Sequence, residues 1–294
     1  MIDLHMHTIH SDGTDTVEEL LQIAEKQKLE VISITDHNDI GAYKELETNS
    51  VREKFSGKII PGVEISTSYK NIMIEVLGYG IDYKKIKIHK INHETIQRKV
   101  LQQLKDKAKE LGLKFNEKIE IDMKDPCKIF AGSVFSRELL KYKENEEIIQ
   151  EKLEKFTDVT FFRVHQCNPE SPFFIDESKE CLSIEEAIEK IHNAGGLAFL
   201  AHPFMYPYKN KEQVIEEILM NTQLDGLECE YVEFSREERD ILIDIARRNK
   251  KLVSGGTDYH HNNKPNIQMG TGKNNNILIS RDFIKEWENK VYSI

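Results

Sequence analysis

The sequence alternates short apolar runs with amphipathic segments, and this alternation limits the choice of fold more than any other feature. Thr16, Ser183 and Ser235 each stand three residues before a glutamate, a capping box that predicts the start of a helix. Residues 31–35 and 197–201 are short apolar runs, which predict buried strands. Strands that alternate with helices favour a mainly parallel sheet with right-handed crossovers. We therefore expect an α/β fold.

The middle of the chain has a different character. Residues 93–182 are rich in lysine and glutamate, and apolar residues recur there at helical spacing in one long segment: Ile96, Val100, Leu101, Leu104, Ala108 and Leu111. A mainly helical stretch between two α/β halves predicts an insertion into one domain. The expected boundaries are residues 1–92 and 183–294 for the α/β domain and residues 93–182 for the helical insertion.

Net charge and cysteine spacing narrow the class of protein. The formal net charge of -10 argues against long nucleic acids as partners, because phosphate recognition depends on basic surfaces. The four cysteines form no Cys-x-x-Cys pair, which favours a reduced, intracellular protein. We expect neither a signal peptide nor a membrane span, because no window approaches about 18 consecutive apolar residues. The expected location is the cytoplasm.

Histidines and carboxylates gather at the ends of the predicted strands. His5 and His7 share one face of the first strand, and the others follow or end later strands: His37, Glu64, His202, Asp258 and His260. In a (β/α) barrel the C-terminal strand ends form one face, where active sites lie. Imidazole and carboxylate ligate zinc, manganese and iron, and a carboxylate can bridge two ions about 3.5–4 Å apart. A single histidine would carry little weight, but the joint pattern predicts a metal site.

These residues stand in motifs that resemble the PHP (polymerase and histidinol phosphatase) family. The motifs, in order, are His5-Met6-His7, Ser11-Asp12-Gly13, Thr35-Asp36-His37, Pro61-Gly62-Val63-Glu64, Ala201-His202-Pro203 and Gly255-Gly256-Thr257-Asp258-Tyr259-His260. The resemblance covers residues 1–92 and 183–294. It implies a distorted seven-stranded (β/α) barrel with an inserted, mainly helical subdomain that covers the active site. Within the family the chain looks most like stand-alone bacterial phosphoesterases.

The resemblance also implies two or three divalent ions, which could be manganese, zinc or iron. One ion would be held by His5, His7, Glu64 and Asp258, a second by Asp12, His37 and His260, and a third by Glu64, His202 and one further residue. That further residue is usually a histidine in a His-x-Leu-Gly-Tyr-like stretch, and here Glu75 takes its place. A carboxylate at this position favours manganese or iron over zinc, or leaves the third position weak or empty.

Four other residues are candidates for catalysis or substrate binding. Asp36 adjoins His37 and is expected to orient a ligand during catalysis, and Lys264 and Glu228 are candidate substrate contacts. Arg137 follows a stretch where related phosphoesterases carry a Gly-Arg-Pro-His-like segment that holds phosphate. It either takes over that catalytic and phosphate-binding contact or is a solvated helix residue.

The expected function is hydrolysis of a small phosphomonoester, such as a nucleotide or a nucleoside bisphosphate, by a metal-bridging hydroxide. Three alternatives stay open. The same site could cleave phosphodiesters as an exonuclease on short oligonucleotides. A metal barrel could instead hydrolyse an amide or a lactone. The domain could also be a non-catalytic metal-bound module. The sequence specifies neither the substrate nor the oligomeric state.

Overall fold

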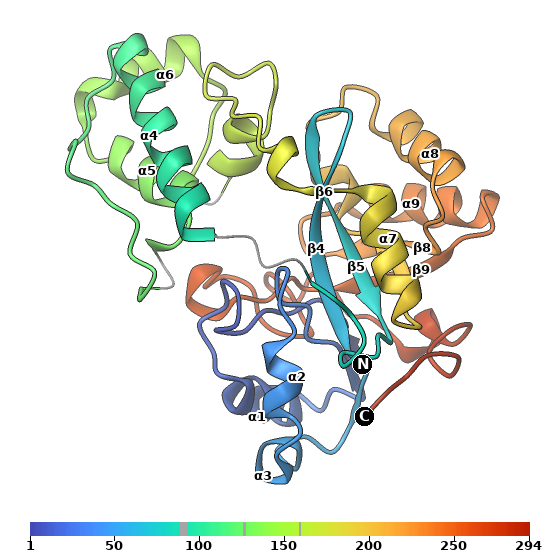
Figure 1. Ribbon diagram of the computed structural model, residues 1–294. Helices are drawn as coiled ribbons and strands as arrows, with labels where there is room; N and C mark the ends of the chain where they lie inside the picture. The colour runs from blue at the N-terminus through green and yellow to red at the C-terminus, as the bar shows by residue number, and fades with distance from the viewer. Residues whose placement is uncertain (89–92, 126–127, 159) are drawn as a thin grey trace. The chain divides into compact units, whose positions relative to one another are not determined.

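The computed structural model describes residues 1–88, 93–125, 128–158 and 160–294 (Figure 1). The chain divides into two compact units. The first unit comprises Met1–Tyr69, Ile74–Lys90 and Cys181–Ile294, and the second comprises Lys70–Met73 and Ile91–Glu180. Residue 92, where the sequence predicts the α/β domain to end, and Cys127 lie outside the described residues.

Three helices of the first unit begin at the predicted capping boxes. They are α1 (Val17–Lys26), α7 (Ile184–Asn193) and α9 (Arg236–Arg248). In each, the N-cap hydroxyl accepts the amide hydrogen of the glutamate three residues later, and that glutamate accepts from the N-cap amide. The three predicted helix starts are therefore confirmed.

The strands of the described residues form two sheets. The first sheet is parallel and contains β1 (Ile2–Asp3), β2 (Val31–Ile32) and β3 (Lys58–Ile59). The second has the order β6-β4-β5-β7-β8-β9, with β6 (Leu182–Ser183), β4 (Gly62–Tyr69), β5 (Ile72–Tyr79), β7 (Leu197–Leu200), β8 (Gly226–Tyr231) and β9 (Leu252–Gly256). β7, β8 and β9 are parallel to one another, whereas β5 is antiparallel to β7.

This arrangement confirms the α/β class and shows that the strand directions are mixed. The predicted strands 2–8 and 31–35 are shorter than expected, since only their first residues pair in the sheet. Beyond those residues an isolated bridge joins Met6 to Tyr259 and another joins His37 to Glu64. The seven-stranded barrel stays a prediction.

The remaining helices are α2 (Gly41–Glu45), α3 (Asn49–Arg52) and α8 (Lys211–Asn221) in the first unit, and α4 (His93–Leu111), α5 (Ala131–Leu139) and α6 (Glu146–Lys152) in the second. Short helical turns occupy Lys143–Asn145, Phe162–Gln166, Ser178–Glu180, Pro203–Met205, His261–Asn263 and Arg281–Ile284. The long helix predicted from residues 96–111 is α4. Among the residues that the structure describes, no helix has the length and apolarity that a membrane crossing needs.

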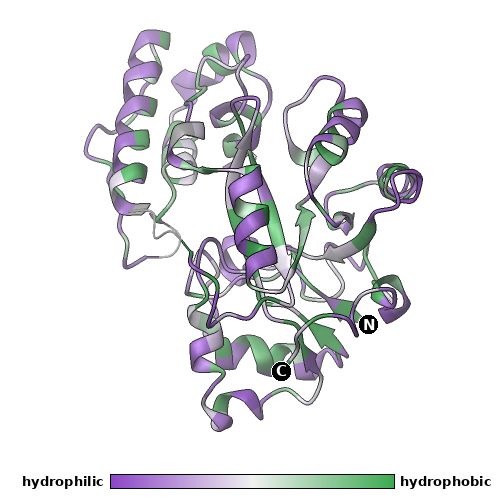
Figure 2. Cartoon of the chain, turned by 45° about the vertical axis from the view of Figure 1, so that its right-hand side comes forward, coloured by the Kyte–Doolittle hydropathy of each residue, from purple (hydrophilic) through white to green (hydrophobic). Residues whose placement is uncertain are grey.

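Each unit has its own hydrophobic interior. In the first unit α7 packs against β4 and β7 (Figure 1), and Tyr79, Phe199 and Trp287 form a buried aromatic group. In the second, Phe135 and Phe161 lie at the centre of a separate cluster. Figure 2 shows that the central strands are largely hydrophobic, whereas the helices carry hydrophilic and hydrophobic residues on different sides.

Candidate metal centre

The sheet order brings the ends of distant strands together in the first unit. His5 and His7 follow β1, His37 follows β2, and His202 follows β7. Asp258 and His260 follow β9, while Glu64 and Glu75 lie on β4 and β5 themselves. Chain segments from both ends of the sequence therefore contribute to one cluster of buried histidines and carboxylates.

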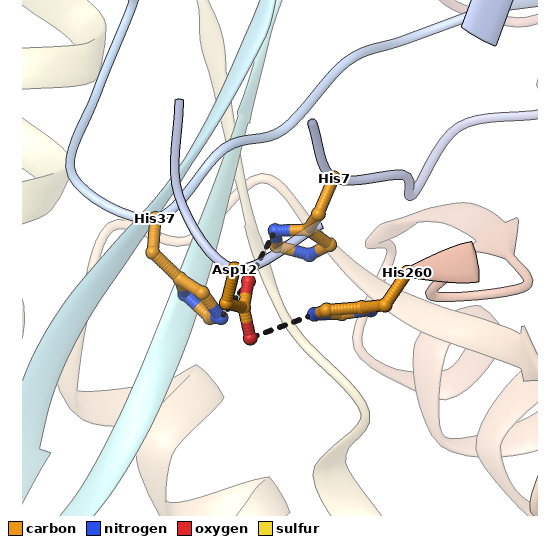
Figure 3. A group of neighbouring side chains, drawn as sticks. All are labelled: His7, Asp12, His37 and His260. Carbon is orange, nitrogen blue, oxygen red and sulfur yellow. Dashed lines mark ion pairs between the residues drawn. The ribbon is translucent and has the colours of Figure 1, made fainter. Parts of the chain in front are cut away.

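One group of side chains surrounds the carboxylate of Asp12 (Figure 3). His260 Nε2 lies 3.0 Å from Asp12 Oδ2. His7 Nδ1 and His37 Nε2 lie 3.5 and 3.7 Å from Asp12 Oδ1. One ligand atom from each of the four residues lies within 4.8 Å of the others, which is close enough for them to share a cation. Three of these residues form the predicted second ligand set, and His7 joins them.

A second group lies around one oxygen of Glu64. His5 Nε2 and His7 Nε2 are 3.2 and 3.3 Å from Glu64 Oε2. The same two nitrogens are 3.6 and 3.4 Å from Asp258 Oδ1. The structure therefore brings together all four residues of the first predicted ligand set.

The other oxygen of Glu64 belongs to a third group. Glu64 Oε1 is 3.1 Å from His202 Nε2, and Glu75 Oε2 is 3.2 Å from the same nitrogen. Glu75 Oε1 also lies 3.5 Å from His37 Nδ1. Glu75 thus occupies the position that the sequence assigned to it, beside His202 and Glu64. All nine predicted ligands lie in this cluster.

The donor set fits divalent cations. Within the described part of the chain, His7 Nε2, His37 Nδ1 and Asp12 Oδ1 are buried and have no hydrogen-bond partner. A buried polar atom without a partner is costly, so such atoms indicate a missing ion or ligand. Because imidazole nitrogens and carboxylate oxygens are the donors that zinc, manganese and iron accept, the cluster suits these metals.

Burial and nearby charges shift the pKa values of His7 and His260 in opposite directions. Burial lowers the pKa of His7, but the nearby carboxylates of Asp258 and Glu64 outweigh burial and raise it to about 10. Burial lowers the pKa of His260 to about 4, although Asp12 opposes this shift. Without a cation, His7 therefore holds a proton at neutral pH, whereas His260 is already neutral and able to ligate a metal.

Two of the predicted ligands have an unusual backbone conformation. The φ angles of His202 and Asp258 are +24° and +54°, in the left-handed region that residues other than glycine seldom adopt. Such strain persists only where the surroundings hold it, and it is concentrated at functional sites.

Asp36 is buried and accepts three hydrogen bonds from the loop that carries Asp12. Its oxygens lie 2.7 Å from the amide nitrogen of Thr8, from Thr8 Oγ1 and from Ser11 Oγ. It belongs to none of the groups that could hold a cation among the described residues. The structure therefore shows Asp36 supporting the loop, and its predicted catalytic role stays a prediction.

Lys264 and Tyr231 both contact Asp258. Lys264 Nζ and the Tyr231 hydroxyl donate to Asp258 Oδ2, the latter at 2.7 Å. Lys264 thus contacts a predicted ligand, and its predicted substrate contact stays a prediction. Tyr231 was not among the predicted site residues, and its position at the end of β8 was the one signal available. Lys264 lowers the pKa of Asp258 well below its usual value, against the effect of burial.

The two remaining candidates lie elsewhere. Glu228 is fully buried and contacts His5 and the backbone of His202, and its predicted substrate contact stays a prediction. Arg137 lies on α5 in the second unit, where its Nε is 3.3 Å from Asp158 Oδ2. Its contact with a phosphate stays a prediction.

Comparison with known proteins agrees with this geometry. The model of the PHP domain family matches residues 3–229, which is more than half of the chain. The chain is 28% identical over 269 residues to the 5'-3' exoribonuclease Rnm of Escherichia coli, covering 88% of this chain and 84% of that protein. It is 25% identical over 271 residues to the 3',5'-nucleoside bisphosphate phosphatase of Chromobacterium violaceum, covering 88% and 87%.

A solved structure has the same fold. It is that of a candidate metal-dependent phosphoesterase from Bifidobacterium adolescentis, with a TM-score of 0.63 and 21% identity, covering 99% of this chain and 96% of that one. The family match, the fold and the clustered histidines and carboxylates lead to one assignment. The chain belongs to the PHP domain family of metal-dependent phosphoesterases.

Proposed function

We propose that this chain hydrolyses a small phosphorylated compound of the nucleotide class, with two or three divalent cations bound in the cluster of the first unit. The observation that carries the proposal is that nine histidines and carboxylates, Glu64 and Asp12 among them, meet in one cluster, where three buried atoms have no hydrogen-bond partner among the described residues. Buried polar atoms rarely lack a partner unless an ion, a ligand or water supplies one.

The distances support the ligand sets that the family resemblance implies. His5, His7, Glu64 and Asp258 would hold one cation, and Asp12, His37 and His260 a second. Glu64, His202 and Glu75 would hold a third, with two carboxylates and one imidazole. Such cations supply Lewis acidity to a phosphoryl oxygen and lower the pKa of a bound water.

The chain's own residues hold these donors in place. Lys264 and Tyr231 occupy Asp258 Oδ2, which leaves Oδ1 directed at His5 and His7. Asp36 holds the loop of Thr8 and Ser11, which precedes Asp12. A donor set fixed before substrate arrives needs little rearrangement during the reaction.

Two substrate types are supported by the relatives. The Escherichia coli relative is named as a 5'-3' exoribonuclease and the Chromobacterium violaceum relative as a nucleoside bisphosphate phosphatase. Both names describe hydrolysis at a nucleotide. The net charge of -10 disfavours long polymers, so nucleotides, nucleoside bisphosphates and short 5'-phosphorylated oligonucleotides are the proposed substrates.

The test is product release by manganese-loaded protein from nucleotides, nucleoside bisphosphates, sugar phosphates, histidinol phosphate and a short 5'-phosphorylated RNA. His37→Ala removes a proposed ligand, and we expect turnover to be lost while the fold is kept. His192→Ala is the matched control, because His192 bonds Asp225 in the first unit away from the cluster. Equal activity in wild type and His37→Ala would contradict the site assignment. Release of nucleoside monophosphates from the RNA, without phosphate release, would select the exonuclease.

A further inference from the structure

Glu228 is a buried carboxylate behind the metal cluster, and nothing in the proposed chemistry uses it. It lies on β8, and its side chain has no exposed surface. The pairing of β8 with β9 shifts register between Glu228 and Glu230, as in a β-bulge. Bulges redirect side chains next to active sites. The bulge at Glu228 lies beside a buried carboxylate, and a buried carboxylate is tolerated only if its oxygens are hydrogen-bonded.

Both oxygens of Glu228 contact proposed metal ligands. Glu228 Oε1 is 2.8 Å from His5 Nδ1, and Glu228 Oε2 accepts the backbone amide hydrogen of His202 at 2.7 Å. His5 follows β1 and His202 follows β7, so one side chain joins two segments that are far apart in the sequence.

The contact with His5 selects which ring nitrogen faces the cluster. With Glu228 as the acceptor of this hydrogen bond, His5 Nδ1 carries its proton. The nitrogen that would ligate a cation is then His5 Nε2, which lies 3.2 Å from Glu64 Oε2. Without Glu228 the imidazole ring of His5 could take the other tautomer or flip. Either change would remove Nε2 as a nitrogen that can bind a cation.

The contact with His202 holds a strained backbone. The φ of His202 is +24°, and Glu228 fixes the amide of that residue. In this conformation His202 Nε2 lies 3.1 Å from Glu64 Oε1. Glu228, His5, Glu64 and His202 therefore form a closed cycle of four contacts.

We propose that Glu228 is a positioning residue that couples the two metal positions sharing Glu64, and this inference rests on the proposed function. Loss of the two Glu228 contacts would free the side chain of His5 and the backbone of His202 together. The donors Asp12, His37 and His260 make no contact with Glu228 among those described, so the position that they form keeps its affinity.

Glu228→Gln tests the proposal, because a glutamine offers one acceptor oxygen where two hydrogens must be accepted. Metal-free protein is titrated with Mn²⁺ and bound ions are counted by equilibrium dialysis with elemental analysis. The absorption spectrum of Co²⁺-loaded protein reports ligand geometry. Glu230→Gln is the control, since Glu230 is on the same strand but pairs with Arg239 instead.

We expect Glu228→Gln to bind part of its Mn²⁺ about 10- to 100-fold more weakly, to keep at least one ion at wild-type affinity, and to have an altered Co²⁺ spectrum. Glu230→Gln should match wild type. Glu228→Asp keeps the charge and should recover part of the affinity, and it decides the question in the same assays if the glutamine variant does not fold.

Unchanged stoichiometry and affinity in folded Glu228→Gln would overturn the proposal, and so would an equal loss of every ion. If wild-type protein binds no Mn²⁺, the proposed function fails and this inference fails with it. If the wild-type protein binds Mn²⁺ and Glu228→Gln binds it equally well, only the inference about Glu228 is refuted.

Discussion

Tyr231→Phe removes one hydrogen bond from the cluster and leaves the rest of the side chain in place. The Tyr231 hydroxyl donates to Asp258 Oδ2 at 2.7 Å, and the residue is buried. Its ring packs with centroid distances of 5.0 Å to Phe234 and 5.3 Å to His202. Phenylalanine preserves these ring contacts, so the hydroxyl is the one group deleted.

The expected loss of unfolding free energy follows from the charge of the acceptor, Asp258. A hydrogen bond to a charged group contributes about 1.5–3 kcal/mol. Lys264 still donates to the same oxygen in the variant, so the carboxylate is not left unpaired. The lower end of the range therefore applies, and we expect the metal-free protein to lose about 1.5 kcal/mol of unfolding free energy. This corresponds to roughly a tenfold change in the folding equilibrium constant.

Urea unfolding followed by tryptophan fluorescence measures this loss. Trp287 is the single tryptophan, and it lies in the core of the same unit as Tyr231. With a denaturant slope of about 3 kcal/mol/M, the midpoint should fall by about 0.5 M. The protein must be metal-free, because a bound cation would add its own binding energy to stability.

A loss below about 0.5 kcal/mol would refute the reasoning, since it would mean that the hydroxyl contributes no more than a surface group. Tyr292→Phe is the matched control. Tyr292 is 46% exposed, and we expect its hydroxyl to contribute nothing measurable.

Three further predictions concern protons and metal choice. The pKa of His7 is raised from 6.5 to about 10 in the metal-free protein, so protonated His7 stabilises the fold fully below about pH 6.5 and less as the pH rises towards 10. Urea unfolding between pH 6.5 and 10 should show the free energy of unfolding decline, and a flat profile would contradict the prediction. Calorimetry at pH 8 in buffers of different ionisation enthalpy should show proton release from His7 on Mn²⁺ binding and none from His260, whose pKa is about 4. Glu75→His exchanges a carboxylate for an imidazole, so protein equilibrated with equal Zn²⁺ and Mn²⁺ should contain more zinc than wild type does; an unchanged ratio by elemental analysis would argue against Glu75 as a ligand.

The parts of the fold that depend on local chemistry could be predicted from the sequence. The capping boxes at Thr16, Ser183 and Ser235 define helix starts through contacts three residues apart, which the sequence alone displays. The clustering of seven of the nine proposed ligands could be predicted because each follows or lies on a strand of one α/β unit, whereas Asp12 and Glu75 were predicted from the PHP resemblance.

The remaining features depend on tertiary packing. The antiparallel pairing of β5 with β7 is set by how the sheet assembles, which apolar alternation does not specify. The bulge at Glu228 and the contact of Lys264 with Asp258 depend on register and loop geometry. Glu228 and Lys264 contact proposed metal ligands, and the spacing of residues in the sequence does not predict these contacts.

The left-handed backbone at His202 and Asp258 has a consequence for protein engineering. Glycine adopts this conformation at least cost, and other residues held there cost about 1–3 kcal/mol each. Glycine at either position would relieve this strain but remove a proposed metal-binding side chain from around Glu64, and at Asp258 it would also remove the bonds from Tyr231 and Lys264. A thermostability screen on this chain therefore needs metal retention as a second selection criterion.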